Sequence, residues 1–207
     1  VPLLIGAANP GRVLLVSGLT LLAVYLLLFV VIVIGGRLAV KAESDPKIDR
    51  MLGRVPLVGS VRQNLSLARF SSVFRMHLLA GERIDEGLRS AALASRSGRI
   101  REAVEAGAIP GVESGQPVGP ELAKRPEAFT PAFARGFITA ENSGTLDSDL
   151  LRWSERFHEG ARSAMDKLGA HAPKYFYGLI VLIVLWQVFR MVAKIFSGYD
   201  QIFKLID

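Results

Sequence analysis

The sequence predicts an all-α membrane protein, in which a cytoplasmic six-helix bundle lies between two transmembrane helices. Two observations lead to this fold class. The first is a pair of uncharged apolar blocks, Val13–Ile34 and Tyr175–Phe189, which are separated by a charged stretch of over a hundred residues. The second is that this stretch shows little of the period-two alternation typical of strands, and instead repeats apolar residues at helical spacing.

The two apolar blocks differ in length. The first has 22 residues, and because about 20 apolar residues cross a bilayer core of about 30 Å, it predicts a transmembrane helix over 13–36. The second has 15 residues between Lys174 and Arg190. Since the aliphatic stems of these flanking cations can reach the membrane interface, the second block predicts a transmembrane helix over 171–196.

The positions of the cations predict the orientation. Arg12 alone precedes the first block, whereas five cations follow it closely. By the positive-inside rule, residues 37–170 form a cytoplasmic domain, and the segments 1–12 and 197–207 lie on the extracytoplasmic side. The chain opens with Val1 rather than methionine, so we expect a fragment or a processed piece. The five cations are Arg37, Lys41, Lys47, Arg50 and Arg54.

Composition argues against several classes of function. The net charge of +6 includes an excess of four cations over residues 37–174, which is too mild and too dispersed for a nucleic-acid-binding face. The absence of cysteine excludes disulfides and thiolate metal sites. The three histidines are too scattered for metal-ligand spacing, and no glycine-rich phosphate loop is present, so we expect neither a metal nor a cofactor.

The first half of the charged stretch predicts three helices. Apolar residues at helical spacing indicate one over 65–78, which Gly81 ends. A second is expected over about 85–95. Ser97 can cap a third that begins at about residue 98, and the Pro110-Gly111 pair should bend or end it.

The second half predicts three more. Closely spaced prolines leave room for a short helix around 121–124, and Pro131 begins a helix that runs to Asn142. The sixth and longest helix follows apolar residues every three or four positions from Leu146 to Leu168. Gly169 and Pro173 then separate it from the second membrane helix, or merely kink the two together.

Several short segments resemble one protein family. These are 49–59 (DRMLGRVPLVG), 67–70 (LARF), 78–81 (LLAG), 112–117 (VESGQP) and, most specifically, 140–147 (AENSGTLD). In this order and spacing they are similar to the type II secretion F family, whose members also serve type IV pilus and Flp pilus systems. The last segment resembles that family's Gly-Glu-x-Ser-Gly-x-Leu signature.

The resemblance implies a function that composition alone does not. It implies a non-enzymatic platform protein of the cell inner membrane, multi-pass, that contacts an assembly ATPase, pilin-like subunits and other inner-membrane secretion components. It also implies association into homo-oligomers. The single domain resembles the C-terminal copy of a domain that typical members carry twice. Ala140 and Pro110-Gly111 depart from the family pattern.

Two alternatives remain open at this stage. One is a membrane-anchored cytoplasmic domain that binds a small ligand, as a sensor or an enzyme. The other is a structural membrane protein that uses the helical bundle as an adaptor. Ser95, Ser97, Ser143 and Ser154 have no arranged base that would mark a nucleophile, so we predict no catalytic residue.

Eight residues are candidates for family-motif or interaction roles. Glu141 is the strongest, because a carboxylate before a Ser-Gly turn can accept a partner's arginine, bind a cation with Asp147 or Asp149, or lock the turn itself. The arginines of the second and third helices are candidate docking points for an acidic patch. The full set is Phe70, Gly81, Arg89, Arg99, Gly115, Glu141, Gly144 and Leu146.

Overall fold

The computed structural model describes residues 10–55 and 58–203, and within these ranges it contains helices and no strand, which confirms the all-α prediction. The predicted extracytoplasmic segments 1–12 and 197–207 lie partly outside the described residues. The helices are α1 (Pro10–Lys41), α2 (Pro46–Gly53), α3 (Val58–Leu79), α4 (Ile84–Ala94), α5 (Gly98–Ala103), η1 (Val104–Ala108), α6 (Ile109–Glu113), α7 (Val118–Ala123), α8 (Pro131–Ser143) and α9 (Leu146–Phe203).

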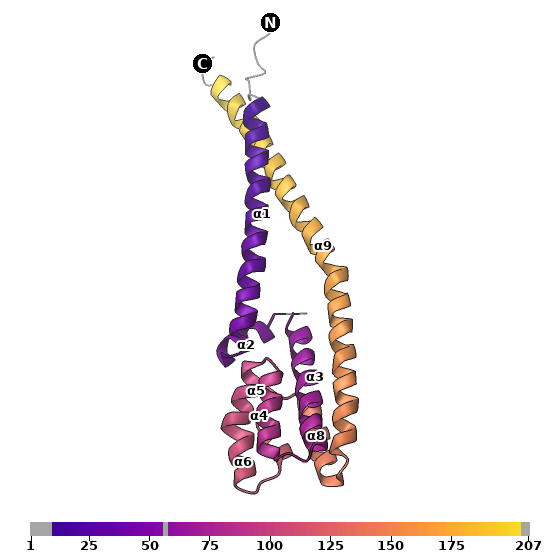
Figure 1. Cartoon of the computed structure of the whole chain (residues 1–207). Coiled ribbons are helices and arrows are strands. Elements are labelled where there is room, and N and C mark those ends of the chain that lie inside the picture. Colours follow the sequence, from indigo (N-terminus) through magenta and orange to yellow (C-terminus); the bar gives the residue numbers. More distant parts are fainter. Residues whose placement is uncertain (1–9, 56–57, 204–207) are drawn as a thin grey trace.

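Figure 1 shows a helical domain with two long helices rising from one of its ends. The domain contains α2 to α8 and the N-terminal part of α9, while α1 and the rest of α9 extend away from it. In the part of the chain that the structure describes, no helix combines the length and apolarity needed to cross a membrane. The transmembrane helices over 13–36 and 171–196 therefore stay predictions.

The long last helix runs without interruption. The sequence left open whether Gly169 and Pro173 separate two helices or kink one, and α9 continues through both positions. Proline removes one backbone donor from the helix. The turns on either side keep their own hydrogen bonds, so the loss of one bond does not end a helix of 58 residues.

The third predicted helix also continues past its proline. After α5, the chain widens into the π-helical segment η1 and then re-forms an α-helix in α6, where Pro110 occupies the first turn. The wider π-helical turn lies directly before Pro110, in the segment whose carbonyl groups a proline ring would otherwise crowd. Pro110 and Gly111 thus follow a change of helix type without ending the run, which reaches Glu113.

Helix α2 was not predicted, although its start signal is present in the sequence. Asp45 caps it by accepting a hydrogen bond from Lys47 N at 2.9 Å, and Pro46 occupies its first turn. The short helix α7 begins at Val118, three residues before the predicted start at 121. The helix predicted from Pro131 to Asn142 is confirmed, because α8 spans Pro131–Ser143.

The core of the domain is built around an aromatic cluster, joined by several smaller apolar residues of α4 and α5. Phe70 of α3 lies 5.2 Å from Phe129, measured between ring centroids, and Phe133 of α8 lies 5.1 Å from Trp153 of α9. Edge-to-face pairs such as these stabilise by about 0.5–1.5 kcal/mol beyond their buried area. The cluster joins α3, α8 and α9, and α3 also packs against α4.

Candidate interaction sites

The turn between α8 and α9 carries the most specific sequence motif. Gly144 ends α8 in the left-handed conformation, with φ of +71°, and Thr145 N donates to Ala140 O at 3.0 Å. This six-to-one hydrogen bond is the Schellman arrangement, in which glycine avoids the strain that a β-carbon brings. Thr145 Oγ1 then donates to Asp149 Oδ2 at 2.8 Å, in the first turn of α9. The motif therefore encodes a rigid helix–turn–helix corner.

Glu141 lies on α8 just before this turn, and its carboxylate binds a different helix. Val118 N donates to Glu141 Oε1 at 2.7 Å, and Gly119 N donates to Oε2 at 2.8 Å. These two amides lie at the N-terminus of α7, where Pro117 supplies no side-chain cap. Glu141 thus satisfies two amides that otherwise lack an intrahelical partner. The sequence left open a partner contact, a cation site and a lock of the turn itself for Glu141, and the structure shows its carboxylate fastening α7 to α8.

Gly119 makes this contact between α7 and α8 sterically feasible. A β-carbon at position 119 would lie 2.7 Å from Ile138 Cγ1 and 2.9 Å from both Ile138 Cα and Glu141 Oε2. Because real β-carbons do not approach other atoms so closely, any larger residue would push α7 away from α8. Position 119 was not singled out from the sequence. A glycine two residues after the Gln116-Pro117 pair was the available signal.

Two of the acidic residues around the turn, Glu141 and Asp149, form contacts within the domain. Asp149 pairs with Arg152 and accepts from Thr145, while both oxygens of Glu141 are occupied by amides. Across the described residues, no group of three or more histidine, aspartate or glutamate side chains is placed to hold a metal ion.

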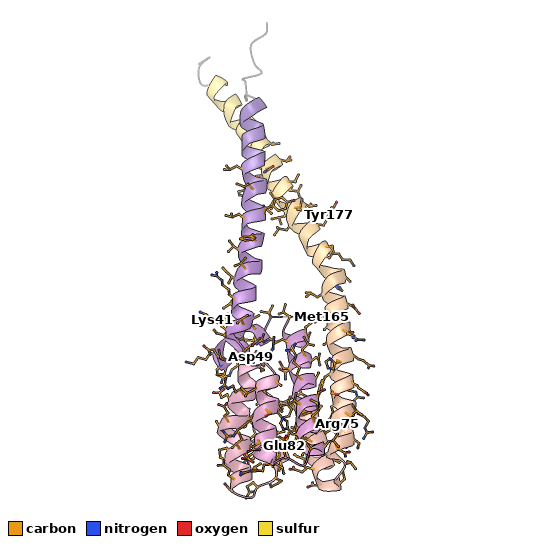
Figure 2. The ribbon with its side chains drawn as sticks, in the orientation of Figure 1. Lys41, Asp49, Arg75, Glu82, Met165 and Tyr177 are labelled. Carbon is orange, nitrogen blue, oxygen red and sulfur yellow. The ribbon has the colours of Figure 1, made fainter. Side chains whose placement is uncertain are left out.

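The glycine turns of the motif segments lie at one end of the domain. The connections from α3 to α4 and from α8 to α9 lie at the end far from the top of α1, which we call the distal end (Figure 1). Gly81 and Gly115 both adopt positive φ, +69° and +79°, at such connections. Glu82, next to Gly81, is labelled at this end in Figure 2. The distal end therefore brings together turns that are far apart in the sequence.

The other candidates fall in three environments. Phe70 is fully buried in the aromatic cluster, and Leu146 packs against the same core. Arg89 of α4 is exposed and lies 3.8 Å from Glu113, with more than half of each side chain accessible. Arg99, in contrast, is only 12% exposed and lies inside the domain. Of the two arginines predicted as docking points, Arg89 is therefore accessible and Arg99 is not.

Arg99 belongs to a buried network centred on Asp49, which sequence reasoning missed. Asp49 of α2 has no exposed surface, and its carboxylate accepts from Arg62 Nε at 2.7 Å, from the Arg99 amide at 3.2 Å and from the Ser97 hydroxyl. Arg99 Nε forms an ion pair with Asp49 Oδ2 at 3.3 Å. The two arginines exceed the charge of the single carboxylate, and Arg99 also donates from Nη2 to Gln63 Oε1 at 2.8 Å.

The same network fastens the base of α1 to the domain. Arg62 also donates to Ala39 O of α1 and to Arg96 O, each at 3.2 Å. Arg99 Nη1 donates to Glu127 O at 2.9 Å, in the connection that precedes α8. Asp49 and its two arginines therefore hold together the end of α1, helix α2, helix α3 and two loops.

These contacts alter the proton affinity of Asp49. Burial by itself raises the pKa of the carboxyl group, but hydrogen bonds from Ser97, Arg62 and the Arg99 amide, together with the charge of Arg99, outweigh it. The pKa of Asp49 is therefore lowered, so the residue is ionised at neutral pH. Removal of one member of this buried ion pair should strongly destabilise the folded chain, because the remaining charge is left uncompensated.

Comparison with known proteins adds one relationship. No protein-family model matches the chain. A stretch of 151 residues is 27% identical to the type IV pilus assembly protein PilC of Thermus thermophilus. The chain is a distant relative of PilC. The match covers 72% of this chain and 37% of PilC, so the chain spans well under half the length of that relative.

The relationship to PilC agrees with the family resemblance at the level of the superfamily. PilC is named as a type IV pilus assembly protein, one of the systems that the resemblance implied.

Proposed function

We propose that the chain is a non-enzymatic platform subunit of the inner membrane, which links a cytoplasmic assembly ATPase to pilin-like subunits in a type IV or Flp pilus or type II secretion machine. The observation that carries this proposal is the distant relationship to PilC. The proposal assigns no catalytic residue and no cofactor to the chain. It includes association with further copies and with other inner-membrane components of the machine.

The shape of the molecule supports an anchored platform. The extended parts of α1 and α9 present large apolar side chains to the outside, such as Leu22 and Phe29 of α1, each 66% exposed, and Leu185 and Phe189 of α9, 63% and 71% exposed. Exposed apolar surface of this extent needs a lipid or protein environment. We therefore place these segments in the bilayer and residues 37–170 in the cytoplasm, as the charge distribution also predicts.

The distal end is the proposed docking face for the ATPase. It lies away from the apolar parts of α1 and α9, and it carries the turns of three family-like segments, 78–81, 112–117 and 140–147 (Figure 1). Rigid turns such as the Gly144 corner present side chains and backbone in one fixed arrangement. The exposed Arg89–Glu113 pair on α4 and α6 provides charges with which a partner can form ion pairs.

Crosslinking in native membranes tests this proposal. A photoreactive residue replaces Arg89, and a matched variant carries it at Lys41, an exposed position at the opposite end of the domain (Figure 2). We expect the Arg89 variant to capture an assembly ATPase and the Lys41 variant not to. Capture of unrelated proteins alone, in cells that express such a machine, would contradict the platform role.

Two simpler measurements address the rest of the proposal. A topology reporter fused after Asp207 should read extracytoplasmic, and a cytoplasmic reading would contradict the two-span arrangement. The purified chain should not hydrolyse ATP. Turnover that persists on purification to homogeneity would instead favour an enzyme domain anchored to the membrane.

A further inference from the structure

A groove of about 370 Å³ opens where the domain meets the space between α1 and α9. Its walls are largely apolar and are formed by Val58, Val61 and Leu65 on one face of α3, and by Met165 and Leu168 of α9. Val58 and Met165 are 40% and 46% exposed, so the apolar wall is open to the outside. Figure 2 labels Met165 at the end of the domain from which α1 and α9 rise.

The polar part of the groove is basic. Arg62, Arg69 and Arg96 line it together with a single carboxylate, Glu43. Arg62 is held by Asp49 at 2.7 Å, and Arg96 faces Glu43 at 3.8 Å. Arg69 is half-buried in the wall and has no hydrogen bond or ion pair with any described residue. The groove therefore contains a guanidinium whose charge nothing in the described chain balances.

An occupant that suits this groove must carry an apolar part and an anionic part side by side. A free anion would leave the wall of valine, leucine and methionine exposed, and a purely apolar helix would leave Arg69 without a partner. An anionic phospholipid has both parts, because its phosphate and headgroup adjoin its acyl chains. A guanidinium is well suited to phosphate, since its fork of donors matches the phosphate oxygens.

We propose that this groove binds an anionic phospholipid, with its headgroup on Arg69 and an acyl chain against α3 and α9. The inference rests on the membrane location in the proposed function, which brings the groove close to the headgroup region. Basic pockets beside membrane helices on the cytoplasmic side commonly bind such headgroups. A bound lipid would cover the exposed apolar wall that α3 and α9 form.

Lipid retention by the full chain tests the proposal. The chain is reconstituted in vesicles of phosphatidylcholine and phosphatidylglycerol in known ratio and extracted in mild detergent, and the retained lipids are measured by mass spectrometry. The wild-type chain should be enriched in phosphatidylglycerol relative to the vesicles. Arg69→Gln should reduce that enrichment about fivefold, the effect expected of one cation near an anionic lipid.

A matched variant separates the groove from general surface charge. Arg135 of α8 is exposed and its side chain also has no partner among the described residues, so Arg135→Gln removes the same charge elsewhere. It should leave the enrichment unchanged. Met165→Glu, which places a carboxylate in the groove, should repel the headgroup, whereas Met76→Glu at another exposed methionine should not. Circular dichroism verifies that each variant is folded.

The outcomes distinguish this inference from the function on which it rests. Equal retention of the two lipids by the wild type, or equal loss in the Arg69 and Arg135 variants, overturns the lipid site alone. Flotation of the chain with the vesicles is measured in the same samples. A chain that does not float with vesicles overturns the membrane location, and with it both proposals.

Discussion

Removal of the Glu141 carboxylate should destabilise the domain by separating α7 from α8. Glu141→Ala deletes both acceptors of the Val118 and Gly119 amides. These amides belong to buried residues at the start of α7, where the N-cap residue Pro117 offers no side-chain acceptor. Among the described residues, no other side chain accepts a hydrogen bond from these amides. The variant therefore leaves two polar groups without partners in a region that water reaches poorly.

The magnitude follows from the two hydrogen bonds. A hydrogen bond to a charged group contributes about 1.5–3 kcal/mol. Because Glu141 is partly exposed, its two hydrogen bonds together should contribute near the lower end of the summed range. We expect Glu141→Ala to lower the free energy of unfolding by about 3 kcal/mol, which corresponds to a decrease in Tm of about 10 °C for a domain of this size. Glu141→Gln, which keeps one acceptor, should lie between the alanine variant and the wild type.

Thermal unfolding of the full chain in detergent measures this effect. The chain has two tryptophans, and a Trp186→Phe background leaves Trp153, which packs on Phe133 in the core, as the fluorescent reporter. Glu155→Ala, an exposed carboxylate on α9, is the matched control and should leave Tm unchanged within about 1 °C. An unchanged Tm in Glu141→Ala, accompanied by reduced capture of the ATPase, would refute the capping argument and make Glu141 a partner contact.

Two further variants examine the buried contacts. Asp49→Asn should lower Tm at pH 7 by the equivalent of about 3 kcal/mol, because Arg62 and Arg99 lose their balancing charge. The pKa of Asp49 is lowered in the folded chain, so its stabilisation is complete above the ordinary value of about 3.9 and is lost as pH falls through the folded value. The difference in Tm between wild type and Asp49→Asn should therefore shrink in scans below about pH 4, and a constant difference would contradict the ionised network. Gly119→Ala should lower the free energy of unfolding in urea by about 1–3 kcal/mol, because its β-carbon would clash with Ile138. Gly169→Ala, where a β-carbon meets no atom, should be neutral or slightly stabilising. Equal effects of the two substitutions would argue against the close packing of α7 on α8.

Features that depend on residues close together in the chain were predictable from the sequence. Helical spacing of apolar residues indicated α3, α4, α8 and the start of α9, because each helix buries one face and its period is a local property. The special backbone conformation of Gly144 was likewise indicated by residues 140–147, because it involves a single turn, and the structure adds the six-to-one hydrogen bond. The all-α class and the resemblance to a family that serves pilus systems were predictable from the sequence for the same reason.

Which polar side chains meet depends on how distant helices pack against one another. Glu141 was recognised, but its partners lie 22 and 23 residues away on another helix, and no local pattern names them. Asp49 was noted only as the first residue of a family-like segment, and it is fully buried between arginines 13 and 50 residues further along. Arg99 was expected on an open face for the same reason. Helix periodicity reports that a side chain faces inward or outward relative to its own helix, whereas the burial of a charge depends on whether distant helices bring an opposite charge to it.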